Sequence, residues 1–145
     1  MLATIQNHQS HQSDNDFVAS FQAARISLVI ELRKISNLIQ AGDAPNQQLK
    51  ERFCEALVDY VAMGHFGLYE RIYRHGDSAE NNLGLLAREY YALMLRGTRL
   101  ALLFNDHHSV DCKDDIKASR FILEFSELGM MLAQRFEAED HLLKI

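Results

Sequence analysis

The sequence has no tryptophan, one proline, two cysteines and seven glycines among its 145 residues. So little proline and glycine leaves few turns, and β-branched residues rarely cluster, so strands are not indicated. No run approaches 18 uninterrupted apolar residues, and no basic region precedes an apolar run at the N-terminus. We therefore expect neither a membrane span nor a secretory signal, and a helical protein that stays in the cytoplasm.

The two cysteines, Cys54 and Cys112, lie far apart and form no CxxC motif, a pattern typical of reduced cytosolic thiols. Twenty acidic residues against fifteen lysines and arginines give a net charge of -5. Direct nucleic-acid binding is therefore not expected, because it depends on basic surfaces that release counterions. A basic protein partner suits this charge.

Apolar residues at helical spacing divide the chain into four long segments. Residues 1–15 lack this periodicity and predict a flexible tail, whereas residues 16–145 predict a single domain. Four long helices with short connections predict an all-α protein, an antiparallel four-helix bundle. The expected helices run from about Phe17 to Gly42, from Asn46 to His75, from Ala79 to Asn105, and from Asp111 to the end of the chain.

Two charged side chains, Arg25 and Asp140, occupy contrasting positions in the predicted bundle. Arg25 lies off the apolar stripe of the first helix and is expected to be solvated. On the last helix, Asp140 falls where an apolar residue is expected, so its carboxylate must be paired, hydrogen-bonded or near the open end of the bundle. The apolar seam expected on that helix consists of Ile122, Phe125, Gly129, Leu132, Phe136 and Leu143.

The stretch from Phe53 to Arg74, FCEALVDYVAMGHFGLYERIYR, carries most of the functional information. One helical stripe should face the core: Phe53, Leu57, Tyr60, Gly64, Gly67 and Leu68. A neighbouring stripe alternates acids with large apolar groups: Asp59, Met63, Phe66, Glu70 and Tyr73. It is either a contact surface or a buried polar network, because a solvated face needs no aromatics and a dry core rejects unpaired carboxylates. The two glycines indicate a close helix crossing or a bend.

The segment FCEALVDYVAMGHFGLYERI resembles the FCQxLVDYxSAGHFxxYE pattern of the Rsd/AlgQ family, and RFEAEDHLL near the C-terminus is similar to the family's RFxLED segment. The two matches fall on different helices in the family's order. In the first helix, where the family usually carries DRWLxxR, this chain reads SFQAARISL. The resemblance implies a cytoplasmic bacterial transcription regulator that binds the primary sigma factor of RNA polymerase. No cofactor is implied, and weak self-association is left open.

The resemblance also implies roles for individual residues. Asp59 matches the acid of LVDY and would pair with a basic residue of sigma. His65, Phe66, Tyr69 and Glu70 match GHFxxYE. Phe66 and Tyr69 would be aromatic anchors, and Glu70 would be a second acid. Glu139 and Asp140 match the ED pair, for which we favour a polar network over direct contact.

Other classes of function find less support in the residues. No Glu-x-x-His pair, glycine-rich phosphate loop, GxSxG or HExxH motif occurs, so neither a di-iron site nor an enzyme is indicated. A hemerythrin-like metal sensor would need several inward histidines, whereas the helices supply chiefly His65, His75 and His141. We read His107 and His108 as loop residues that point in different directions, and expect no metal. The sensor, or a family member with a changed partner, remains the alternative.

Overall fold

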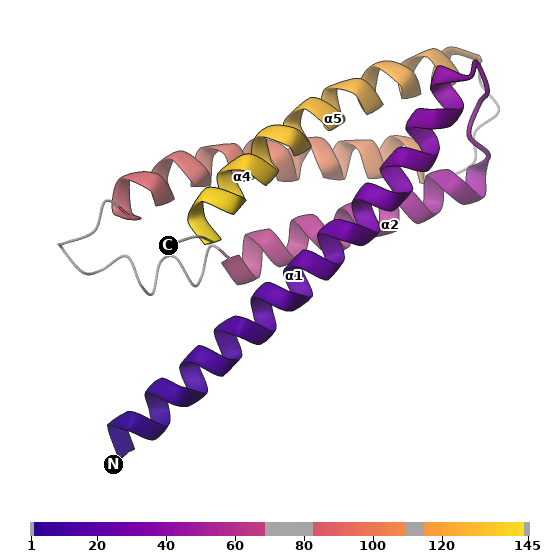
Figure 1. Cartoon of the computed structure of the whole chain (residues 1–145). Helices are drawn as coiled ribbons and strands as arrows, with labels where there is room; N and C mark the ends of the chain where they lie inside the picture. Colours follow the sequence, from indigo (N-terminus) through magenta and orange to yellow (C-terminus); the bar gives the residue numbers. More distant parts are fainter. Residues whose placement is uncertain (1, 69–82, 110–114, 144–145) are drawn as a thin grey trace.

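The computed structural model of the chain describes residues 2–68, 83–109 and 115–143. In this part of the chain all regular structure is helical: α1 (Leu2–Gln40), α2 (Gln47–Met63), the short π-helix η1 (Gly64–Leu68), α4 (Leu83–His108) and α5 (Asp115–Leu143). Successive long helices run in opposite directions, and the first turns of α1 extend past the other helices (Figure 1). The expected all-α architecture of four long helices is confirmed.

Helix α1 differs from its prediction at one end and agrees at the other. It begins at Leu2, whereas the sequence predicted a start at about Phe17. Its C-terminal end is set by Gly42, whose φ of 80° is open to glycine and strained for other residues. The Gly42 amide donates to the Ile39 carbonyl at 3.0 Å and the Asp43 amide to Leu38 at 2.8 Å, which closes the last turn.

Helix α2 begins with a side-chain cap and ends in a π-helical turn. The Asn46 Oδ1 atom accepts a hydrogen bond from the Leu49 amide at 2.9 Å, satisfying one of the free amides of the first turn. At the other end, the five residues of η1 wind more widely than an α-helix. Such wide turns re-aim side chains and are frequent at functional sites. The helix predicted to continue to His75 enters residues 69–82, which lie outside the described ones.

The core lies where the helical stripes meet. It is lined by a chain of aromatic contacts, including Phe53 against Phe104 and Phe125 at ring-centroid distances of 5.5 and 5.4 Å. Phe21 of α1 stacks on Tyr60 of α2 at 4.8 Å. Five of the six core positions expected on the second helix are buried, namely Phe53, Leu57, Tyr60, Gly64 and Leu68. On α4 the buried residues include Tyr90, Met94, Gly97, Ala101 and Phe104.

Helix α5 buries Phe125 and Leu132 of the expected seam, but its inner face is displaced by one residue at other positions. Phe121 and Leu128 are buried in place of Ile122 and Gly129, while Ile122 is 46% exposed. Nearer the C-terminus, the same rotation buries Arg135 and Glu139 and leaves Asp140 exposed. The seam was predicted from apolar residues alone, whereas the inner face of α5 also carries the buried pair of Arg135 and Glu139.

The prediction of a solvated Arg25 is also wrong. Its guanidinium lies 4.8 Å from the centre of the Phe136 ring and pairs with Asp140 across the α1–α5 contact. Its Nε atom also donates to the Tyr60 hydroxyl at 3.1 Å. Arginine can bury its stem and face aromatic rings while its charge stays paired, so a position off the apolar stripe is no guide to exposure.

Within the described residues, none of the helices has the length and apolar character needed to cross a membrane.

The glycines of the second helix let neighbouring elements approach closely, as the sequence indicated. A Cβ at Gly64 would collide with the guanidinium of Arg135, and one at Gly67 would collide with the Phe17 ring. At Gly129 of α5, by contrast, an added Cβ would meet no atom within 4 Å.

We predict opposite effects for two glycine substitutions. Gly64→Ala should lower the free energy of unfolding by roughly 1–3 kcal/mol, because the buried Arg135 cannot move away freely. Gly129→Ala should raise it by about 0.5–1 kcal/mol through helix propensity alone. Urea unfolding followed by circular dichroism measures both. A Gly64→Ala variant as stable as the unsubstituted chain would contradict the close packing described here.

Candidate functional site

The first candidate surface is a groove between α1 and α2, which we call the acidic groove. It is lined by Ser27, Ile30, Glu31, Arg52, Glu55, Ala56 and Asp59. Asp59 is exposed, and Ile30 is 49% exposed beside it. Three carboxylates against one arginine give the groove a negative charge around an apolar strip. That combination suits a helix carrying basic and apolar side chains.

A second groove lies on the other side of α2, against α4, and we call it the apolar groove. Its lining consists of Val58, Val61, Ala62, His65, Phe66, Thr98, Ala101 and Leu102. Phe66 is 71% exposed, which is unusual for so large an apolar side chain, and Leu102 is 49% exposed. The half-buried His65 ring lies 4.8 Å from the Phe66 ring. The groove therefore presents an aromatic edge to a partner.

Two members of the second stripe that the structure describes, Asp59 and Phe66, lie at the surface. Asp59 and Phe66 open onto the two grooves that flank α2, and Met63 between them is half-buried. Of the two interpretations left open by the sequence, the geometry favours a contact surface at these positions. Tyr69 and Glu70 lie outside the described residues, as do Tyr73 and His75.

The carboxylates of Glu139 and Asp140 enter one polar network that crosses the bundle. The Tyr60 hydroxyl is within 2.8 and 2.9 Å of the two Glu139 oxygens and donates to this carboxylate. Arg135, which has no exposed surface, lies 3.5 Å from Glu139 and donates from Nη2 to the Val61 carbonyl at 3.3 Å. Through Arg25, the network continues to the exposed Asp140. It joins α1, α2 and α5.

Burial dominates the electrostatics of this network. It raises the pKa of Glu139 to about 7, although the Arg135 charge and the Tyr60 hydrogen bond act in the opposite direction. Burial and the neighbouring Glu139 charge also raise the pKa of Tyr60, so its hydroxyl keeps the proton that it donates. The folded state therefore holds a proton on Glu139 more readily than the unfolded chain does.

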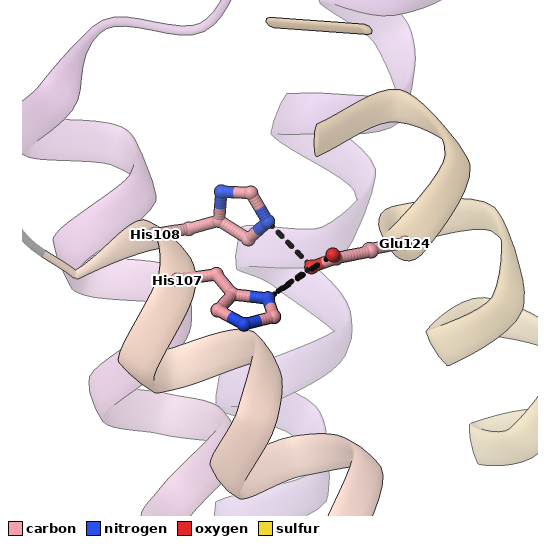
Figure 2. Close-up of side chains that lie close together, drawn as sticks. All are labelled: His107, His108 and Glu124. Carbon is pink, nitrogen blue, oxygen red and sulfur yellow. Dashed lines mark hydrogen bonds and ion pairs between the residues drawn. The ribbon is translucent and has the colours of Figure 1, made fainter. Parts of the chain in front are cut away.

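A third group of side chains was missed by the sequence analysis. His107 and His108 form the end of α4, and both contact Glu124 of α5 (Figure 2). The His107 Nδ1 atom lies 3.1 Å from each Glu124 oxygen, and the His108 Nε2 atom lies 2.7 Å from one of them. The prediction that the two rings diverge in a loop was wrong. Consecutive helical residues can reach one carboxylate when they use different ring nitrogens.

Changing pH tests the buried carboxylate. Because the pKa of Glu139 is higher in the folded chain, its contribution to stability is complete below pH 4.5 and is lost as pH rises toward 7. Glu139→Gln should therefore reduce the loss of unfolding free energy between pH 5 and 8, by roughly 1–3 kcal/mol. Urea unfolding at both pH values measures this. The control is Glu137→Gln on the exposed face of α5, and equal pH dependence in the two variants would contradict the assignment.

Comparison with known proteins adds a second line of evidence. A family model described as "Regulator of RNA polymerase sigma(70) subunit, Rsd/AlgQ" matches residues 1–145. A protein named Regulator of sigma D from Yersinia enterocolitica is 31% identical over 99 residues, which cover 68% of this chain and 59% of that protein. Its namesake from Pectobacterium carotovorum is 27% identical over 100 residues, covering 69% of this chain and 65% of that protein. No solved structure matches the chain significantly.

The chain thus spans about three fifths of the length of the curated relatives it matches. The family match, however, extends over every residue of the chain, from the first helix with its divergent SFQAARISL segment to the RFEAED segment of α5. It agrees with the resemblance seen in the LVDY and GHF motifs of α2 and η1. The chain belongs to the Rsd/AlgQ family of regulators of the RNA polymerase sigma(70) subunit.

Proposed function

We propose that the chain binds the C-terminal, region 4 domain of the primary sigma factor and blocks it sterically. The observation that carries the proposal is the exposure of Asp59 on α2 and Phe66 on η1, each lining a different groove. Family membership supports a sigma factor as the partner. A basic helix-turn-helix domain that reads the -35 promoter element has the charge that the acidic groove accepts.

Charge and apolar contact have separate roles in this binding. The acidic groove attracts and orients a basic helix, which mainly affects the association rate. The exposed Phe66 ring supplies area that becomes buried on binding, which mainly slows dissociation. A partner that contacts both grooves must lie across α2, so Asp59 and Phe66 would be covered together.

The mechanism needs no bond to be made or broken. Sigma region 4 held against α2 could not contact core polymerase and the -35 element at the same time. Housekeeping transcription would then fall, and alternative sigma factors would compete better for the polymerase. We accordingly propose a cytoplasmic, non-enzymatic regulator that acts by occupying its partner's surface.

Asp59→Ala should weaken binding of purified sigma region 4 about tenfold, because it removes one of the three carboxylates that line the acidic groove. The loss should shrink at high salt, where the attraction is screened. Isothermal titration calorimetry at two ionic strengths measures both effects. The matched control is Glu127→Ala, which removes an exposed acid of α5 and should bind normally. Unchanged affinity in Asp59→Ala would remove Asp59 from the site, and no binding by the unsubstituted chain would refute the proposal.

Phe66→Ala should also weaken binding at least tenfold while leaving thermal stability nearly unchanged, because the ring is 71% exposed before binding. Leu123→Ala on α5 is the control, since that side chain is 70% exposed but lies on neither groove. Calorimetric titration and thermal melting of both variants separate binding from folding. Equal losses of affinity in the two variants would indicate a general effect of surface apolar area and would count against an anchor at Phe66.

A further inference from the structure

We propose that His107, His108 and Glu124 bind a zinc ion between the end of α4 and the start of α5. None of the three residues lines the acidic or the apolar groove. They form the one group of three or more metal-ligating side chains brought together in the described ranges 2–68, 83–109 and 115–143. The site is therefore independent of the proposed sigma-binding surface, and the sequence analysis did not expect it.

The distances suit a tetrahedral ion. Two imidazole nitrogens and a carboxylate are a common ligand set for zinc, with metal–ligand distances of about 2.0–2.2 Å that place ligands roughly 3.3 Å apart. Here His108 Nε2 lies 2.7 Å and His107 Nδ1 lies 3.1 Å from a Glu124 oxygen. One ligand atom from each of the three residues can be chosen so that all three atoms lie within 4.8 Å of one another. Both nitrogens face the carboxylate in Figure 2.

The atoms that would bind the ion are the two ring nitrogens that now face Glu124, Nδ1 of His107 and Nε2 of His108. A zinc-bound imidazole is neutral and uses the lone pair of the nitrogen that faces the metal. On zinc binding, each ring would move its proton to its other nitrogen through solvent, with no net change in charge.

Neighbouring contacts hold the rings in place. The His108 ring packs against Phe104 and Phe121 at centroid distances of 4.6 and 5.0 Å. The Gln47 side-chain amide donates to the His108 carbonyl at 3.3 Å, which anchors the end of α4 to the start of α2. Arg120 donates from Nε to Glu124 at 2.8 Å and orients the carboxylate from outside, as outer partners of metal ligands commonly do.

The site also leaves room for a fourth ligand. His108 is buried, but the side chains of His107 and Glu124 are 30% and 22% exposed. Water can therefore approach from the side of these two residues and complete the coordination. The Arg120 charge beside the carboxylate opposes a divalent cation, so we expect binding in the micromolar range rather than the far tighter binding of closed structural zinc sites.

The test uses the full chain, freed of metal with a chelator and then dialysed. Equilibrium dialysis against Zn²⁺ with elemental analysis should give one zinc per chain. Binding of Co²⁺ as a substitute should produce the visible absorption of a tetrahedral site. Zn²⁺ should also raise the melting temperature, because it binds the folded chain.

His107→Gln and Glu124→Gln should each weaken zinc binding at least tenfold, since loss of even an outer partner of a ligand costs about 10–100-fold. Both residues are partly exposed, and circular dichroism without metal checks that the variants fold. His141→Gln is the control, because it removes an exposed histidine from the other end of α5. The proposal would be overturned if either ligand variant bound zinc with full affinity, or if the unsubstituted chain bound none. Either result would show that the three side chains form a hydrogen-bonded contact alone. Sigma binding is not measured in this test, so a negative result for zinc leaves the proposed function intact.

Discussion

A carboxylate with no exposed surface, that of Glu139, sets the arrangement of the bundle. A buried carboxylate is costly unless hydrogen bonds and opposite charge surround it, and here the Tyr60 hydroxyl and Arg135 supply them. These partners are correctly placed at only one rotation of α2 against α5. That rotation turns the apolar stripe of α2 inward and Asp59 and Phe66 outward. The contact surface is therefore oriented by a polar interaction in the core as much as by apolar packing.

Much of the fold could be predicted from the sequence, because apolar residues repeat at helical spacing and caps such as Asn46 mark where helices begin. The same spacing left the stripe of Asp59 and Phe66 open to two interpretations, a contact surface or a buried polar network, and only their exposure in the structure favours the first. The register of α5 could not be obtained in this way. Its inner face carries Arg135 and Glu139, and no property of either residue alone reveals a partner more than seventy positions away, as Tyr60 is from Glu139. The pairing of Arg25 was missed for the same reason, because its partner Asp140 lies near the other end of the chain.

The histidine cluster shows a different limit of sequence reasoning. Spacing on one helix places the side chains of His107 and His108 about 100° apart, which argues against a shared ligand. That reasoning holds for a partner on the same helix. A carboxylate on a neighbouring helix can meet the near nitrogen of one ring and the far nitrogen of the other, as Glu124 does. The cluster fastens α4 to α5 near the α1–α2 connection, while the buried network acts farther along the bundle. Two sets of polar contacts thus restrain α5 at separate points along its length.

The neighbouring acids Glu139 and Asp140 occupy opposite environments, one sealed in the core and one facing water. Removing a single residue between Leu132 and Arg135 would turn everything beyond it by about 100° and bring Asp140 into the place of Glu139. The shorter aspartate side chain would then replace the longer glutamate beside the Tyr60 hydroxyl, and Arg25 would lose its partner. Side-chain replacements on the outer face of α5 leave this arrangement untouched. Evolution of this helix should thus proceed by exchange of surface residues at constant length.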